Sequence, residues 1–299
     1  MFCGVWQKQL ATARNLASLC NTAVNPAVKP LVFANFLAPS MTSVYAAVAT
    51  GVGRSLGVPA ELIEGRDFDQ LRDGSVDLAF ICGLPYVRLC AERPGMLHPL
   101  AAPILDEARY QDRPVYFSDV IVRADSPARS FGDLRGRSWA HNDPSSLSGC
   151  LLVRYHLLQM GESEAFFSGV TFSGGHQESV RRVLSGEVDA SAIDSQVLGV
   201  ACLRDPDLAR QFRVIAVLGP STIPPVIATG TVPREIQALT GDAICALGGD
   251  AAGRDALARG LIRRFTPIAD RAYDDIREKM AAVDGVSAGR PPARPVLAG

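Results

Sequence analysis

The feature that most constrains the fold is a junction that occurs twice, at 71–81 (LRDGSVDLAFI) and 184–193 (LSGEVDASAI). Each copy reads as the end of a helix at a glycine, then one polar residue, then a Val-Asp pair that begins an apolar strand. Glycine suits this position because the end of a helix commonly needs a left-handed backbone. The separation is too long for a solenoid repeat. It therefore predicts two similar α/β lobes, with a chance likeness of two junctions as the alternative.

The first lobe alternates strands and helices without tight hairpin turns. The expected segments are a strand at 31–36, a helix from an N-cap at Ser40 to Gly57, a strand ending at 62–64, a short helix at 67–72 and a strand at 76–81. This alternation is typical of a parallel sheet covered by helices. We predict an α/β fold in which each lobe is a mainly parallel sheet flanked by helices.

Two long apolar strand candidates, 114–124 and 213–218, lie where the chain would pass between lobes. We interpret them as hinge segments, with ordinary sheet strands as the alternative. The expected divisions are an N-terminal extension of unclear status at 1–30, a discontinuous lobe 1 at 31–115 and 216–283, a lobe 2 at 116–215 and a disordered tail at 284–299. Arg14 and Asn15 interrupt the N-terminal apolar run, so no clear signal peptide is predicted.

Bulk properties exclude some classes of partner. The net charge is −1, which provides no basic field for nucleic acid or an anionic membrane. An anionic ligand must therefore be held by local geometry. The seven cysteines are scattered without zinc-site or disulfide spacing, and this leans towards a reducing compartment.

The loop Asp143–Gly149 (DPSSLSG) has the composition of an anion-binding helix entry. It follows a predicted strand and precedes an apolar helix at 150–160. Unpaired N–H groups and the helix dipole favour negative charge there. Ser146 and Ser148 add hydroxyl donors, and Gly149 permits close approach. The alternative is that one serine only caps the helix.

Further polar residues follow other predicted strands. His176 comes after Phe172-Ser-Gly-Gly and begins a helix, so its imidazole is placed to donate to the same anion. Asp194 ends the strand 188–193, where open α/β sheets place their ligands. Tyr86 follows the strand of the first junction. A capping or surface role is the alternative for His176.

Signals for catalysis are missing. The sequence lacks GxSxG, HExxH, Walker and GxGxxG motifs, and its four histidines show no metal-ligand spacing. We expect no catalytic residue, no metal and no cofactor. An enzyme that uses Ser148 and His176 as nucleophile and base stays open as a further hypothesis, because a fold does not fix a function.

Several segments, in order, resemble the phosphate/phosphite/phosphonate-binding proteins of ABC transporters (the PhnD-like family). They are 118–126, 131–137, 143–149, 173–176 and 188–195, and the likeness extends back to Leu31 through 74–80 and 83–86. The resemblance implies the type 2 periplasmic-binding-protein fold, in which two α/β lobes close on a ligand in the cleft between them.

By position, the resemblance implies that Ser146, Leu147 and Ser148 hold the ligand oxygens and that His176 contacts the ligand. It also implies that Asp194 lies near the pocket, and, by weaker matches, that Tyr86 and Ser118 lie near the ligand. Leu147 departs from the family pattern, which commonly has Thr there. One hydroxyl donor is thereby lost, at a cost of roughly 1.5–3 kcal/mol for a bond to a charged group. A weaker site or a different ligand is then expected.

The resemblance implies a non-catalytic, monomeric, periplasmic solute-binding protein. Such a protein captures a small oxyanion of the phosphonate, phosphite or phosphate class and delivers it to the transmembrane subunits of an ABC permease; nucleic acid is not a partner. The alternative is a cytoplasmic ligand-sensing or regulatory protein with the same fold. The cysteine pattern and the N-terminal sequence favour this alternative.

Overall fold

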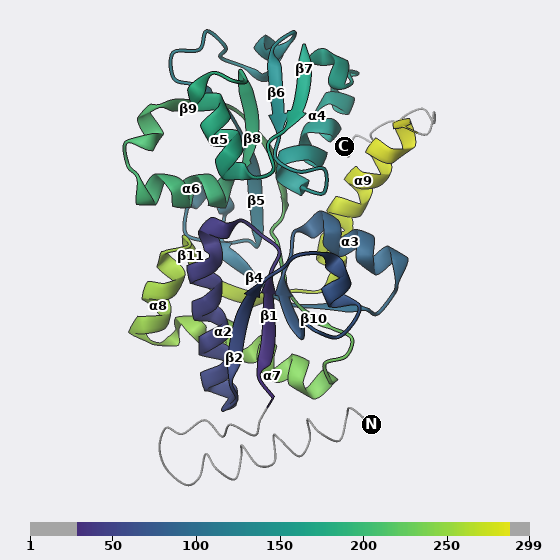
Figure 1. Ribbon diagram of the computed structural model, residues 1–299, viewed down its shortest axis with the longest axis vertical. Coiled ribbons are helices and arrows are strands. Elements are labelled where there is room, and N and C mark those ends of the chain that lie inside the picture. Colours follow the sequence, from purple (N-terminus) through teal and green to yellow (C-terminus); the bar gives the residue numbers. More distant parts are fainter. Residues whose placement is uncertain (1–28, 288–299) are drawn as a thin grey trace. The chain divides into compact units, whose positions relative to one another are not determined.

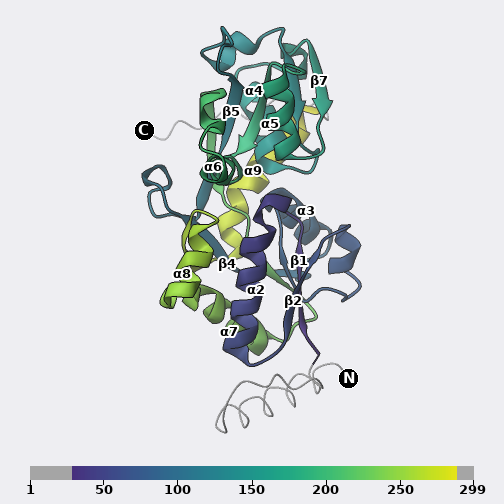
Figure 2. The same cartoon turned by 60° about the vertical axis from the view of Figure 1, so that its left-hand side comes forward.

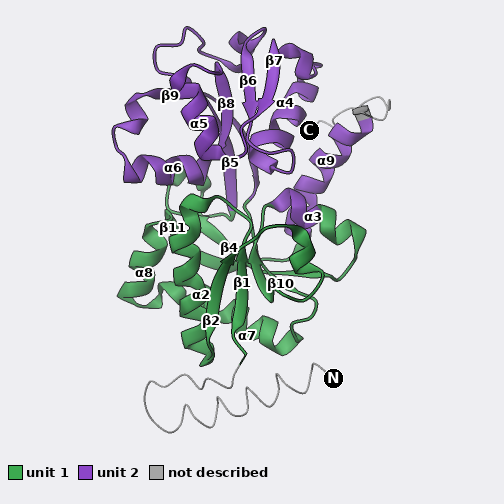
Figure 3. Ribbon diagram, viewed as in Figure 1, with its two compact units in different colours: residues 1–82, 88–114, 223–270 green, residues 83–87, 115–222, 271–299 purple. Residues whose placement is uncertain are grey.

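The computed structural model describes residues 29–287, which form two compact units (Figure 3). Unit 1 contains the described residues up to 82, together with 88–114 and 223–270; unit 2 contains 83–87, 115–222 and the described residues from 271 onward. The sequence-based interpretations of 1–28 and 288–299 lie outside the described residues.

Unit 1 is built on a mixed six-stranded sheet with the order β11-β4-β10-β3-β1-β2 (Figure 1). Its strands are β1 (Leu31–Asn35), β2 (Ala60–Glu64), β3 (Leu78–Phe80), β4 (Leu97–Leu105), β10 (Val226–Thr229) and β11 (Ile262–Pro267). Strand β1 pairs in parallel with β2 and β3, whereas the other three ladders are antiparallel. All five residues of β1 are buried, as expected for a parallel strand covered on both faces.

Helices cover this sheet. They are α2 (Thr42–Leu56), α7 (Arg234–Ala246) and α8 (Ala251–Ala258), with short turns η1 (Pro39–Met41), η2 (Phe68–Leu71), η3 (Ala108–Tyr110) and η8 (Leu247–Gly249). Figure 2 shows α2 running beside β1 and β2. Tyr45 of α2 stacks on Phe80 of β3 with ring centroids 4.1 Å apart, which fixes the helix on the sheet.

Unit 2 is built on a five-stranded sheet with the order β7-β6-β8-β5-β9. Its strands are β5 (Val115–Arg123), β6 (Ser138–His141), β7 (Gly169–Phe172), β8 (Ala190–Asp194) and β9 (Phe212–Thr222). Strand β6 is parallel to β7 and β8, whereas β5 is antiparallel to β8 and β9.

The helices of unit 2 include α5 (His176–Ser185), α6 (Ser195–Arg204) and the pair formed by a π turn η5 (Leu147–Leu151) and α4 (Leu152–Gln159). The others are η4 (Phe131–Leu134), η6 (Glu164–Phe166), η7 (Leu208–Arg210), η9 (Asp270–Tyr273) and α9 (Asp274–Ser287); α3 (Gly83–Glu92) begins in unit 2 and ends in unit 1. Val180 and Val183 of α5 pack on Ile193 of β8 in the core.

The two Val-Asp junctions are structurally equivalent. Gly74 and Gly186 both have the left-handed backbone that the sequence predicts, with φ of 79° and 77°. Each aspartate then accepts a backbone N–H at the start of the neighbouring parallel strand: Asp77 Oδ2 from Val32 at 3.0 Å, and Asp189 Oδ2 from Ser138 at 2.9 Å. The repeated sequence therefore encodes a repeated strand-to-strand contact.

The fold class is confirmed, and several details differ from the sequence-based expectations. Ser40 is not the N-cap of α2, because the chain enters this helix through the turn η1 and Met41 is the N-cap. The short helix expected at 67–72 is the 3₁₀ turn η2. Residues 83–86, which follow the strand of the first junction, form the first turn of α3. Residues 216–222 belong to unit 2, since they extend β9 along β5.

Helix α9 also differs from the expected divisions. It is grouped with unit 2, not with lobe 1, because it packs on α4 and β9. It continues to Ser287, so 284–287 are helical where a tail was expected.

Candidate functional site

The predicted anion loop forms the turn that leads into α4. Ser146 is the N-cap of the π turn, with its Oγ accepting from Gly149 N at 3.0 Å. Earlier in the same loop, Asp143 Oδ1 accepts a hydrogen bond from Ser145 N at 2.7 Å. The first N–H groups of such a turn have no intrahelical acceptor and favour an anion. The helix entry that the sequence predicts is therefore present.

Two carbonyl oxygens in this turn are engaged by buried donors. Ser118 Oγ donates to Ser148 O at 2.6 Å, and a ring nitrogen of His141 lies 2.7 Å from Gly149 O. Carbonyl oxygens repel an anion. Donors that hold these two oxygens therefore reduce the repulsion that an anion at the turn would meet. Ser118, expected near the ligand, thus acts in this structure on the loop itself.

His176 lies against the same turn. It begins α5 and is 8% exposed, with its Nε2 3.3 Å from Ser148 Oγ and 3.3 Å from Asn142 Nδ2. Because the amide of Asn142 donates, Nε2 accepts and the ring proton resides on Nδ1. That Nδ1 is buried without a hydrogen-bond partner in the described residues. The nitrogen beside Ser148 Oγ is thus the accepting Nε2, and the donor without a partner is the other ring nitrogen.

Burial lowers the pKa of His176 to about 4, although the charge of Asp143 raises it. The imidazole is therefore neutral near pH 7. Its one N–H is a neutral donor, so the ring supplies no permanent positive charge to the site.

Gly149 brings the backbone unusually close to Asn142. A Cβ at this position would lie 1.8 Å from Asn142 Oδ1 and 3.2 Å from His176 Cε1. Only glycine fits. The sequence predicts that Gly149 lets a ligand approach the backbone, whereas in the structure the side chain of Asn142 occupies the space beside its Cα. The sequence-based prediction did not include Asn142, although this residue directly follows β6 and precedes the loop.

Leu147 has a structural role. Its side chain is fully buried. A Cβ built on Gly83 would come within 3.5 Å of Leu147 Cδ2 and 2.4 Å of Ile276 Cδ1, so these residues form one tight apolar contact. The side chain of Leu147 therefore faces the protein interior, and only its backbone is suited to a polar ligand.

Asp194 stands where the sequence predicts, at the carboxyl end of β8, in register with Ser118 of β5. Its carboxylate caps α6 by accepting from Gln196 N at 2.8 Å and Val197 N at 3.1 Å. Burial raises the pKa of Asp194 to about 7, and the charge of Asp119 adds to this shift.

Tyr86 is placed in a different contact. It lies in the first turn of α3 and is fully buried, with its ring edge against Tyr273 at a centroid distance of 4.9 Å. The structure thus joins Ser118, Ser148 and His176 by hydrogen bonds, and brings Asp194 to them by strand pairing.

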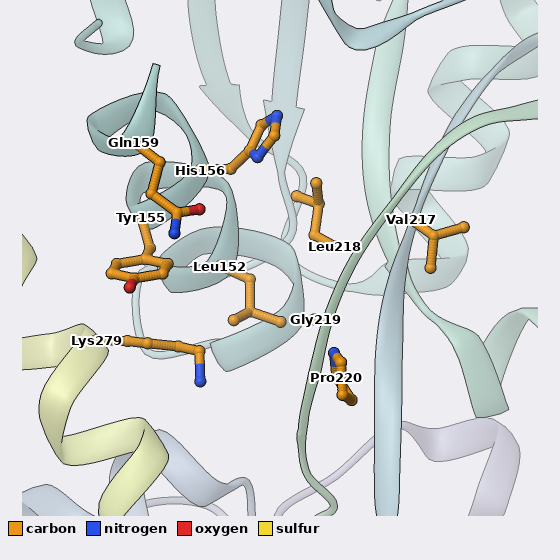
Figure 4. Close-up of a pocket in the computed structure, with 9 residues that line it drawn as sticks. All are labelled: Leu152, Tyr155, His156, Gln159, Val217, Leu218, Gly219, Pro220 and Lys279. Carbon is orange, nitrogen blue, oxygen red and sulfur yellow. The ribbon is translucent and has the colours of Figure 1, made fainter. Parts of the chain in front are cut away.

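A separate cavity of about 190 Å³ lies between α4, the end of β9 and α9 (Figure 4). Its polar side chains are those of Tyr155, His156, Gln159 and Lys279. The ammonium of Lys279 already donates to Asp275 Oδ2 at 3.0 Å. None of the sequence-predicted ligand residues lines this cavity.

A family model described as the periplasmic, phosphonate substrate-binding protein of ABC transporters matches residues 31–273. The chain belongs to this family. The phosphonate-binding-protein assignment supports the transport interpretation and gives no support to the cytoplasmic alternative.

Solved structures of this fold are similar over most of the chain. A binding protein component of an ABC phosphonate transporter from Pseudomonas aeruginosa is 17% identical, with a TM-score of 0.75 and 91% of each chain covered. PhnD1 from Prochlorococcus marinus, in complex with methylphosphonate, is 19% identical with a TM-score of 0.74, covering 89% of this chain and 100% of that one. A Xanthomonas citri protein bound to ATP is 21% identical with a TM-score of 0.64, covering 86% of this chain and 98% of that one. At these identities the likenesses establish the fold.

Within residues 29–287, no helix has the length and apolar character needed to cross a bilayer. No group of three or more His, Cys, Asp or Glu side chains in that range is arranged to hold a metal ion.

Proposed function

We propose that this phosphonate-binding-family protein binds a small tetrahedral phosphorus oxyanion at the Ser146–Gly149 turn. The observation that carries the proposal is the buried pair of Ser148 Oγ and His176, whose Nδ1 proton has no acceptor in the described residues. An oxyanion supplies several acceptors at once, and the N-terminal turn of a helix adds further donors. Asp194 and Tyr86 are proposed to border the ligand.

The ligand class is phosphonate, phosphite or phosphate, held with one hydroxyl fewer than the family pattern provides. Leu147 directs its side chain into the core, so this position offers only a backbone N–H. A lost bond to a charged group weakens binding by about one to two orders of magnitude.

The site supports binding and not catalysis. In a serine nucleophile the histidine must remove the hydroxyl proton, which requires a basic nitrogen near neutral pH. Burial lowers the pKa of His176 to about 4, and Asn142 shares the lone pair of the nitrogen nearest Ser148. The protein is accordingly proposed to act as a monomeric carrier in the periplasm, delivering its ligand to the transmembrane subunits of an ABC permease.

Titration calorimetry of the full chain tests the ligand assignment. Methylphosphonate, phosphite and phosphate are the test ligands, and acetate is the control for a planar carboxylate. We expect saturable one-to-one binding of at least one phosphorus anion and none of acetate. If no phosphorus anion binds at millimolar concentration, the assignment is wrong.

Fractionation tests the cellular role separately. The native protein is expected in the periplasmic fraction. Recovery in the cytoplasm with an intact Met1 would contradict the carrier role, whatever the calorimetry gives.

A further inference from the structure

His141 is a fully buried polar residue at the end of β6, outside the set of residues that the sequence predicted for the ligand. Its two ring nitrogens have different partners. Nδ1 lies 2.7 Å from Gly149 O, and Nε2 lies 2.7 Å from Glu164 Oε1. The ring therefore connects the anion turn, Ser146–Gly149, through Nδ1 to η6 through Nε2.

Both partners are hydrogen-bond acceptors. A carbonyl oxygen cannot donate, so the 2.7 Å contact with Gly149 O requires a proton on Nδ1. The His141 hydrogen bond lowers the pKa of Glu164 to about 2, so the Glu164 carboxylate is ionised and requires a proton on Nε2. An imidazole that donates from both nitrogens is an imidazolium.

Within residues 29–287, Trp139 presents a competing contact. Its indole Nε1 lies 3.2 Å from Nδ1 of His141, and it would donate there only if that nitrogen were unprotonated. An unprotonated Nδ1 would then face the lone pairs of Gly149 O at 2.7 Å, which is repulsive. The shorter contact decides the protonation state.

We propose that His141 is held as an imidazolium beneath the anion turn and is a positioning residue for ligand binding, oriented by Glu164. This inference deepens the proposed function and rests on it. The imidazolium fixes the Gly149 carbonyl away from the ligand and places a buried positive charge directly behind the turn. Glu164 keeps that charge in place without touching the turn.

The far end of this arrangement reaches solvent. Glu164 is 37% exposed and also accepts from Arg154 Nε at 3.0 Å. Both line an open hollow of about 310 Å³ beside α9. Arg154 also interacts electrostatically with Cys150 and Asp284. The accessible carboxylate allows the buried ring to be tested without altering the turn.

The protonation state is measured directly by nitrogen-detected NMR of the histidine rings at pH 7, assigned with His141→Phe. The expected spectrum shows protons on both nitrogens of His141 and a single ring proton on His176. A His141 ring with one protonated nitrogen at pH 7 overturns the proposal. This NMR measurement needs no ligand, so its outcome does not depend on whether the proposed function is correct.

The effect on binding is measured with Glu164→Gln and the matched control Glu162→Gln. Glu162 is two residues away and pairs with Arg135 Nη2 at 2.5 Å, so its substitution makes the same charge change without a contact to His141. Methylphosphonate affinity relative to the wild type is followed from pH 6 to pH 9. Dividing by the wild-type value removes the titration of the ligand itself.

Glu164→Gln removes the carboxylate that accepts the Nε2 proton, so it is expected to weaken binding about tenfold at high pH and to approach wild-type affinity at pH 6. Glu162→Gln is expected to follow the wild type throughout. A loss in Glu164→Gln that does not depend on pH, or one that Glu162→Gln shares, overturns the positioning role. If the wild type itself binds no phosphorus anion, the proposed function fails and the NMR result alone decides the state of His141.

Discussion

Gly149 has room for only a hydrogen atom on the side that faces Asn142. A methyl group there would lie 1.8 Å from Asn142 Oδ1 and would displace an amide that contacts His176. Gly149→Ala is therefore expected to weaken methylphosphonate binding by at least tenfold, measured by calorimetry.

The control for this change is Gly169→Ala, where an added Cβ meets nothing within 4 Å. This variant should bind as the wild type does. Equal affinities for both variants and the wild type would show that the tight contact is unimportant for the site.

The protonation of His176 predicts a defined pH dependence of stability. An unfolded histidine titrates near pH 6.5 and folded His176 near 4, so the unfolded chain binds the extra proton between these values. Acidification from pH 7 to 4 then costs up to about 3 kcal/mol through this residue. Asp194 acts in the opposite direction: its pKa rises from 3.8 to about 7, so its contribution is largest at low pH and is lost as the pH rises through 7.

Comparison with His176→Gln isolates the histidine, because the Asp194 contribution is common to both proteins. The measurement is the free energy of unfolding by urea at several pH values between 4 and 7. The wild type should lose stability relative to the variant as the pH falls. A difference that stays constant over this range would contradict a buried neutral His176.

For single residues, the sequence identified side chains that can donate hydrogen bonds, but not the contacts that orient those side chains. The hydroxyls of Ser146 and Ser148 and the imidazole of His176 were predictable, because their residue types and their positions after strands indicate an anion. Asn142 and His141 were not, because their roles depend on contacts with His176 and Glu164, 34 and 23 residues away.

Among the secondary-structure elements, the Val-Asp junctions determine how two parallel strands meet in each sheet. Asp77 is 4% exposed and accepts from Val32 N, so Asp77→Ala leaves a buried N–H without this acceptor. We expect a loss of about 1–3 kcal/mol in the free energy of unfolding. The equivalent Asp189 is 41% exposed at its side chain, and water can replace it.

Asp189→Ala is therefore expected to cost less than Asp77→Ala, although Asp189 also accepts from Ser138 Oγ at 2.7 Å and lies 3.6 Å from Arg137 Nη1. Urea unfolding of the two variants at pH 7 provides the comparison. A larger loss for Asp189→Ala would contradict the burial argument.

The parallel strands and left-handed glycines were predictable from local sequence, whereas three antiparallel strands of unit 1 were not. Strand β4 contains Pro99 and Pro103, which read as strand breakers in isolation. They are tolerated because the strand pairs along its length with β10 and β11, from distant parts of the chain.

For the whole molecule, the sequence predicted two α/β units and a discontinuous chain path, but not all of the boundaries. Strand β9 continues to Thr222 because it pairs with β5, and α9 joins unit 2 because it packs on α4. Both facts depend on contacts between segments far apart in the sequence. A local pattern of hydrophobic residues does not contain them.

A ligand that binds only the native protein stabilises the whole chain. At 100 times its dissociation constant, methylphosphonate should raise the free energy of unfolding by about 2.7 kcal/mol. Thermal unfolding with and without ligand measures this, with acetate as control. An unchanged midpoint at that concentration would mean that the calorimetric signal did not report binding to the folded state.

If the turn at Ser146–Gly149 is the oxyanion site, calorimetry will separate Ser148→Ala from Ser145→Ala. Both variants remove one hydroxyl from the same loop, but Ser148 Oγ lies against His176 whereas Ser145 Oγ is bonded to Asp143. Ser148→Ala should weaken methylphosphonate binding by about 10- to 100-fold, and Ser145→Ala should leave it within about twofold. Wild-type affinity in Ser148→Ala, or an equal loss in both variants, would contradict the assignment.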